Sequence, residues 1–156
     1  MNAALAEPEH VQRAASLSLS LLSPEDVLRA AVMALASAPG AERVTLGLPT
    51  SANNTYANSG AGRHKTSKYL IWRNSEAWTM RASWGPRPAI AHPVVIGLAI
   101  PGPKRMDSDN AVKPYFDAMQ DARVLEDDKH VIGHVVWWCG SREALGFAAI
   151  APVGEA

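Results

Sequence analysis

The feature that most limits the fold of this chain is a short apolar run between two prolines. Val94–Ile100 is almost continuously apolar, and Pro93 and Pro101 bracket it. A run of this length and composition is typical of a strand buried inside a sheet. The chain has 156 residues, which is enough for one domain with its own core around such a sheet.

Hydrophobic periodicity predicts the elements on either side of this strand. Ser23-Pro24 followed by acidic residues is typical of a helix start, and Pro39-Gly40 ends the apolar pattern that follows. The other expected elements are a short helix over about 9–20, a strand over about 43–48, helices over about 67–84 and 109–122, and strands over about 130–139 and 145–151. The order β-α-β-α-β-β predicts an α+β (mixed α/β) fold, with a mixed sheet, helices packed on it, and a final strand pair able to form an antiparallel hairpin.

We divide the chain into a helical N-terminal extension, residues 1–42, and a main domain, residues 43–156. The extension either enlarges a dimer interface or covers a sheet edge. No apolar run approaches the roughly 20 residues that span a bilayer, and residues 1–12 lack the basic region of a secretory signal. A single cysteine, Cys139, cannot form an internal disulfide, so we expect a reducing, cytoplasmic setting and a small buried side chain at this position.

Charge is separated along the chain, although the formal net charge is +0 at pH 7. Residues 1–42 hold two basic and five acidic residues, residues 43–106 hold nine basic residues and one acidic residue, and residues 107–156 hold four basic and nine acidic residues. A basic block beside an acidic one suits a protein that binds a polyanion and gathers carboxylates around metal ions. The alternative interpretation is that surface residues of like charge are clustered along the chain without any functional role.

The acidic block begins with two aspartates directly after the buried strand. Asp107 and Asp109 are two residues apart, and in extended backbone such side chains point to the same side. Because Pro114 is tolerated only near a helix start, we expect regular helix to begin near Asn110 and both aspartates to lie in the loop before it. Lys113 follows Asp109 by four residues, one helical turn, and both can reach one substrate phosphate.

A third carboxylate comes from the Glu126-Asp127-Asp128 segment. Asp128 opens the next expected strand, and if that strand pairs with Val94–Ile100 we expect its carboxylate at the same end of the sheet as the first two. Two or three carboxylates suit Mg²⁺, which prefers hard oxygen ligands and keeps several waters. Helix caps and solvated turns are the alternative interpretation of these acids, and whether Asp127 shares in metal binding stays open.

These motifs resemble the RusA-type Holliday junction endonucleases. The pattern is Asp107-x-Asp109-Asn110-x-x-Lys113, then Phe116-Asp117-Ala118 and Glu126-Asp127-Asp128 before a valine-rich strand, with an upstream loop Pro49-x-Ser51-x-Asn53-x-x-Tyr56. The resemblance covers about residues 43–151. It implies a homodimer that binds four-way DNA junctions and cuts strands of like polarity. It also implies that Asp107, Asp109 and Asp128 bind Mg²⁺ (Mn²⁺ is the alternative metal) and that Lys113 is catalytically important.

DNA contacts are expected from a long loop over Pro49–Lys65, from the helix after it, and from the residues before the first aspartate, because long polar loops are more often functional than connective. The candidates are Asn53, Asn54, Arg63, Lys65, Lys68, Arg73, Lys104 and Arg105. Taken alone, each of these residues is better explained as an ordinary solvated surface residue. The prediction of DNA contacts therefore depends on all of them together.

Other features are interpreted as structure. Trp72 and Trp78 are bulky core or interface candidates, and Trp137-Trp138 places one ring on each face of a strand, for the core and for a dimer partner. His130 and His134 share a strand face, but a zinc site would need further ligands. The rival functions are a related nuclease acting on flaps, forks or phage DNA intermediates, and a DNA-binding module whose acidic cluster is structural.

Overall fold

The computed structural model describes residues 22–59, 62–102, 106–140 and 145–154. The helix expected over 9–20, most of the turn after Gly140, and the candidates Lys104 and Arg105 lie outside the described residues. The side chains of Asn54 and Arg63 lie outside them as well.

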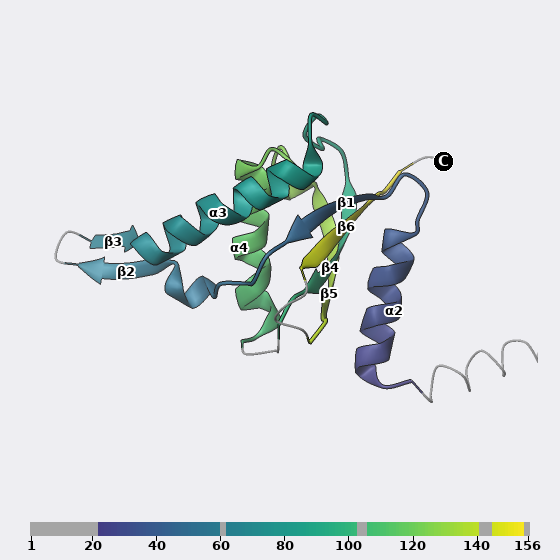
Figure 1. Cartoon of the computed structure of the whole chain (residues 1–156), viewed down its shortest axis with the longest axis horizontal. Coiled ribbons are helices and arrows are strands. Elements are labelled where there is room, and N and C mark those ends of the chain that lie inside the picture. The colour runs from purple at the N-terminus through teal and green to yellow at the C-terminus, as the bar shows by residue number, and fades with distance from the viewer. Residues whose placement is uncertain (1–21, 60–61, 103–105, 141–144, 155–156) are drawn as a thin grey trace, which may run out of the picture.

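Four strands form a mixed sheet in the order β1-β6-β4-β5 (Figure 1). The strands are β1 (Glu42–Leu46), β4 (Val94–Ile100), β5 (Val131–Trp138) and β6 (Gly146–Pro152). β4 pairs in parallel with β5 and antiparallel with β6, which also pairs antiparallel with β1. The mixed α+β fold is therefore confirmed.

The last two strands do not form the hairpin that the sequence suggested, because β4 lies between β5 and β6. Burial along the strands gives the reason. β4 and β6 are buried at most positions and take the two central places, whereas β5 has only half-buried and exposed residues and lies at the edge. A strand that is apolar on both sides needs neighbours and cover on both faces.

Helices cover both faces of this sheet. α3 (Ser67–Trp84) and α4 (Ser108–Asp121) pack on one face, and α2 (Pro24–Ala36) lies against the other (Figure 1). Gly97 allows α2 to approach closely, because a Cβ there would lie 3.3 Å from the Cα of Val32. α2 thus covers a face of the sheet, where the sequence predicted cover for a sheet edge. The expected helix start is confirmed by Ser23, whose Oγ accepts a hydrogen bond from the backbone N–H of Asp26.

The segment between β1 and α3 contains structure that the sequence did not predict. A short 3-10 helix, η1 (Ala52–Asn54), precedes a two-stranded hairpin of β2 (Tyr56–Ser59) and β3 (Gly62–Lys65). The hairpin projects from the body beside the first turn of α3 (Figure 1). Its strands are polar and pair only with each other, so they lack the apolar alternation by which strands are predicted, and the expectation of an irregular loop over Pro49–Lys65 is wrong there.

The main core lies between the sheet and the α3–α4 layer. Fully buried Met80, Ile96, Tyr115 and Met119 belong to it, as the apolar stripe of α4 predicts. Trp72 and Trp138 pack against this core from partly buried positions. None of the helices in the described part of the chain has both the length and the apolar character required to cross a membrane.

Candidate functional site

Two aspartates mark the beginning of α4. Asp107 occupies the N-cap position, yet its carboxylate makes no capping hydrogen bond to the helix. Asp109 lies in the first helical turn, so the expectation of a helix beginning near Asn110 is wrong by two residues. The backbone N–H of Asn110 donates to the carbonyl of Asp107 at 3.1 Å, and this tight first turn lets the helix begin well before Pro114. Both carboxylates are exposed.

Lys113 forms two ion pairs on the side of α4. Its Nζ lies 2.8 Å from Oδ2 of Asp128 and 3.0 Å from Oδ1 of Asp117. Asp128 begins the 3-10 helix η2 (Asp128–His130), just before β5. Asp117 also accepts a hydrogen bond of 2.7 Å from the hydroxyl of Tyr69 on α3. One lysine therefore links α4 to the segment before β5, and Asp117 extends the network to α3.

The hydrogen bonds of this network set the protonation states of its members. The bond to Asp128 raises the pKa of Lys113, against a smaller opposing effect of burial. Burial alone would raise the pKa of Asp117, but hydrogen bonds from Tyr69 and Lys113 outweigh it, and the pKa lies below its ordinary value. Lys113 is therefore a stable cation at neutral pH, suited to contact an anion and poorly suited to accept a proton.

The structure does not gather the three predicted metal ligands. Among the described residues, no three His, Cys, Asp or Glu side chains are placed to hold one metal ion. The argument for a shared sheet end is wrong, because β4 and β5 run in parallel with Val94 opposite Val131. The end of β4 and the beginning of β5 thus lie at opposite ends of the sheet. Asp128 instead approaches the side of α4, at Lys113.

The donor chemistry of these carboxylates still fits a hard divalent cation. Within the described part of the chain, the side chains of Asp107 and Asp109 form no hydrogen bond or ion pair. Asp128 uses only its Oδ2 to contact Lys113. Asp127 is different, because both of its carboxylate oxygens are engaged. Oδ1 accepts the backbone N–H of Lys129 at 2.9 Å, which caps η2 and lowers the pKa of Asp127, and Oδ2 lies 3.5 Å from Nζ of Lys129. Three of the four acids retain carboxylate oxygens for a metal ion.

A cavity of about 310 Å³ opens beside Lys113, where η1 meets α4. Asn53, Tyr56, Tyr69 and Asp117 contribute to its lining. The predicted DNA contact Asn53 is thus brought to the same cavity as the predicted catalytic lysine, although the two are 60 residues apart in the sequence.

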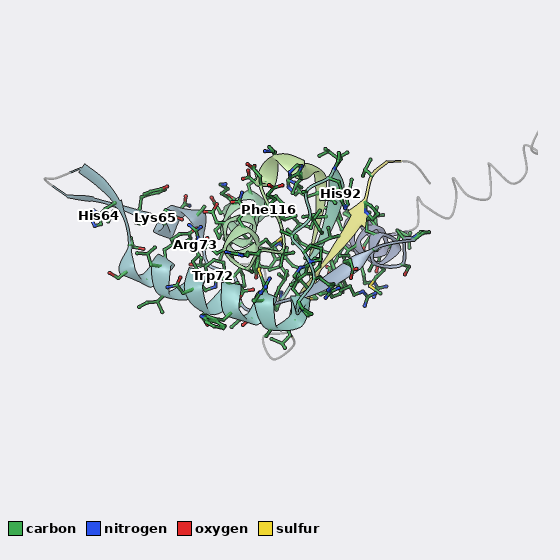
Figure 2. All side chains as sticks on the ribbon, turned by 90° about the horizontal axis from the view of Figure 1, so that it is seen from above. His64, Lys65, Trp72, Arg73, His92 and Phe116 are labelled. Atoms are coloured by element: carbon green, nitrogen blue, oxygen red, sulfur yellow. The ribbon has the colours of Figure 1, made fainter. Side chains whose placement is uncertain are left out.

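The other described DNA-contact candidates differ in whether their side chains already contact another residue of the protein. Lys68 is exposed on α3, and Lys65 lies at the base of the hairpin with its Nζ 5.8 Å from the ring centre of Tyr69 (Figure 2). Arg73 is held by Asp121 on α4, which accepts hydrogen bonds from Nε at 2.5 Å and from a terminal nitrogen at 2.7 Å. Burial would lower the pKa of Arg73, but the bonds to Asp121 raise it. Arg73 therefore joins two helices in addition to any contact with DNA.

The chain that leaves β1 toward this cavity is held by a buried acid that the sequence analysis missed. Glu76 on α3 accepts a hydrogen bond of 2.8 Å from the backbone N–H of Gly47. The carbonyl of Gly47 accepts a bond of 2.6 Å from the hydroxyl of Tyr115, and the carbonyl of Leu48 accepts one of 2.8 Å from the indole of Trp72. Burial raises the pKa of Glu76 to about 7, against the opposing bond from Gly47. Its one sequence signal is that it is the single acid among residues 43–106.

The described part of the chain is an α+β protein with a mixed sheet, a polar hairpin, and a lysine held by two carboxylates beside a cavity. Residues 47–145 match the family described as Endodeoxyribonuclease RusA. The match covers more than half of the chain, so the chain belongs to this family of Holliday junction resolvases, and the resemblance drawn from its motifs is confirmed. Membership makes the protein a nuclease, a hydrolase of DNA. No curated protein matches the chain.

Proposed function

We propose that this protein is a divalent-metal-dependent, structure-selective endodeoxyribonuclease that resolves four-way DNA junctions as a homodimer. Its proposed setting is the cytoplasm, in recombination and repair. The observation that carries the proposal is the contact of Lys113 with Asp128 on the side of α4, within the segment that matches the RusA family. The uncommitted carboxylates of Asp107 and Asp109 on the same helix support it.

The proposed ligands of Mg²⁺, or of Mn²⁺, are Asp107, Asp109 and Asp128. Such an ion, when bound, lowers the pKa of a coordinated water and neutralises charge that develops on the phosphate. Asp107 can serve as a ligand without loss to the helix, because its side chain makes no capping bond that would have to break.

Lys113 is proposed to stabilise negative charge on a non-bridging oxygen or on the leaving 3′-oxygen. The hydrogen bond to Asp128, which raises the pKa of the ammonium group, keeps it charged while the reaction proceeds. Asp117, itself held by Tyr69, restrains the ammonium group on the side of the helix that faces the cavity. Lys113 thereby contributes a positioned positive charge.

The DNA backbone is proposed to follow the hairpin and α3 into this cavity. Asn53 lines the cavity, Lys65 lies near Tyr69 of its lining, and Lys68 is exposed on the first turn of α3. Asn54, Arg63, Lys104 and Arg105 are further proposed contacts. Phosphate contacts of this kind weaken steeply with salt, and we expect at least ~10-fold weaker binding at physiological than at low ionic strength. A four-way junction has approximate two-fold symmetry, so paired cuts need two sites, which a homodimer provides.

A panel of synthetic substrates tests this function. The same labelled oligonucleotides are assembled as a four-way junction, a flap, a fork and a linear duplex, and each is incubated with Mg²⁺ or with EDTA. We expect symmetric paired cuts in the junction, dependent on Mg²⁺, and an intact linear duplex. Faster cutting of flaps or forks identifies the rival nuclease function, and binding without cutting in Mg²⁺ or Mn²⁺ identifies a DNA-binding module.

A further inference from the structure

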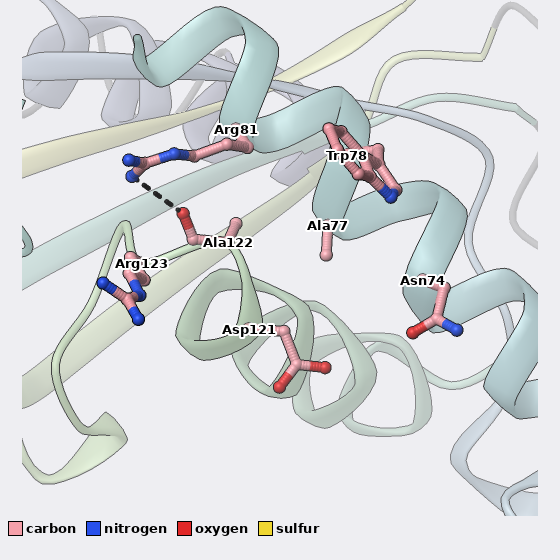
Figure 3. A pocket seen from close by; sticks show the side chains of 7 residues that line it. All are labelled: Asn74, Ala77, Trp78, Arg81, Asp121, Ala122 and Arg123. Carbon is pink, nitrogen blue, oxygen red and sulfur yellow. Dashed lines mark hydrogen bonds between the residues drawn. The ribbon is translucent and has the colours of Figure 1, made fainter. Parts of the chain in front are cut away.

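A second cavity, of about 440 Å³, lies between α3 and the C-terminal end of α4 (Figure 3). Trp78 and Arg81 line it from α3, and Arg123 lines it from the residues after α4. Trp78 is 77% exposed, although a tryptophan carries the largest apolar surface of any side chain. None of these three residues takes part in the site described above.

Arg123 has a backbone conformation that an arginine rarely adopts. It has a positive φ of 56°, and no other non-glycine residue in the described part of the chain has one. The N–H of Arg123 donates to the carbonyl of Gln120 at 3.0 Å, and that of Val124 donates to the carbonyl of Met119 at 2.9 Å. This pair of bonds is the Schellman ending of a helix, whose left-handed position is usually glycine. The arginine thus occupies a position where glycine is less strained.

The charge of this cavity is positive. Asp121 is the acid among its lining residues, and both of its carboxylate oxygens accept hydrogen bonds from Arg73. Arg81 donates to the carbonyl of Ala122 at 3.4 Å, which directs its guanidinium across the end of α4 (Figure 3). Two guanidinium groups and an exposed indole therefore surround one hollow, with its acid already paired.

We propose that this cavity binds a single-stranded segment of DNA next to the branch point, with a base stacked on Trp78 and phosphates held by Arg81 and Arg123. Exposed aromatic rings beside cations are the means by which proteins bind single strands without sequence preference. This inference rests on the proposed function, since it adds a second contact for the same DNA.

The position of the cavity supports a continuous path for one strand. Tyr69, Arg73 and Arg81 of α3 contact Asp117, Asp121 and Ala122 at the α4 side, so the two cavities lie along one seam between the helices. From Tyr69 to Arg81 the helix rises by ~18 Å. At 3.4 Å per stacked nucleotide, this distance corresponds to about five nucleotides.

The rival occupant is a second copy of this protein. Ile71 lies seven residues before Trp78 on the same face of α3 and is 70% exposed, so a protein interface on this helix would use both side chains. A two-fold contact centred on Trp78 would bring Arg81 and Arg123 of each copy toward those of the other, and juxtaposed like charges disfavour such a contact. Charge complementarity therefore favours DNA.

The test uses the full chain, EDTA to prevent cleavage, and two labelled probes, a four-way junction and a 20-nucleotide oligo(dT). Fluorescence anisotropy measures the dissociation constant at several salt concentrations. Trp78→Ala is expected to weaken oligo(dT) binding ~10-fold, as for the loss of one base stack, whereas the matched apolar control Ile71→Ala binds as the wild type does. Arg123→Gly is expected to weaken binding while its melting temperature stays equal or rises, because glycine relieves the strained φ.

The outcomes separate this inference from the function on which it rests. Wild-type binding that Trp78→Ala leaves unchanged overturns the inference alone. Dissociation of a dimer by both Trp78→Ala and Ile71→Ala, seen by sedimentation, overturns it in favour of a second copy. A wild-type protein that binds neither probe overturns the proposed function as well as the inference.

Discussion

Substitution of Glu76 by glutamine tests the buried carboxylate that holds the chain after β1. Glu76 is 4% exposed, and its pKa is raised from 4.5 to about 7 because burial disfavours the charged form. The native protein therefore binds the proton more tightly than the unfolded chain does. By linkage, the free energy of unfolding must fall as the pH rises between these two values.

The magnitude follows from the two pKa values. A tenfold difference in proton affinity corresponds to about 1.4 kcal/mol, so Glu76 alone lowers the free energy of unfolding by roughly 2–3 kcal/mol between pH 5 and pH 8. Glutamine retains an oxygen that accepts the N–H of Gly47 and has no proton to lose in this range. The neighbouring hydroxyl of Tyr115, whose pKa is raised by burial, stays protonated throughout.

Urea denaturation at half-unit steps from pH 5 to pH 8 measures this effect. We expect the free energy of unfolding of the wild type to fall relative to that of Glu76→Gln by roughly 2–3 kcal/mol across the range. Glu25→Gln, which removes an exposed carboxylate from α2, is the control and is expected to follow the wild type. Parallel curves for wild type and Glu76→Gln would refute the reasoning that burial holds this proton.

Two further substitutions test the catalytic lysine and the close approach of α2. Lys113→Ala removes two ion pairs of a side chain that is 59% exposed, so the unfolding free energy is expected to change by at most ~1 kcal/mol while junction cleavage falls at least ~100-fold. A parallel loss of stability and activity would contradict the charge-stabilising role. Gly97→Val places a side chain against the backbone of Val32 and is expected to cost ~1–3 kcal/mol in urea denaturation, whereas wild-type stability would show that α2 does not pack as described.

Local signals were sufficient for much of the fold. The cap at Ser23 and the proline after it predicted the start of α2, and the apolar run Val94–Ile100 predicted β4 with the bounds that the structure shows. These elements are encoded by residues adjacent in sequence, where helix caps and apolar patterns act. The β2–β3 hairpin was missed because its strands are polar, and the place of β6 between β1 and β4 was missed because strand order depends on pairings between distant segments.

The arrangement expected for the candidate site is found in one contact and fails in another. The contact of Lys113 with Asp128 joins two segments that the sequence analysis had placed in one site. The three aspartates do not meet at one end of the sheet as expected. β4 and β5 are parallel, so the residues that follow β4 and the residues that precede β5 lie at opposite ends of the sheet. The bond from Gly47 to Glu76 spans 29 residues and depends on burial, which no local pattern reveals.

The cleavage rate of Asp107→Asn on a four-way junction in Mg²⁺ tests the central claim most directly. Asparagine is as good an N-cap residue as aspartate, so the fold stays intact while one carboxylate of the proposed metal site is lost. We expect cleavage to fall at least ~100-fold while junction affinity, which depends on phosphate contacts elsewhere, is retained; Asp26→Asn on α2 should cut at the wild-type rate. Cleavage by Asp107→Asn at the wild-type rate would contradict the assignment of the site.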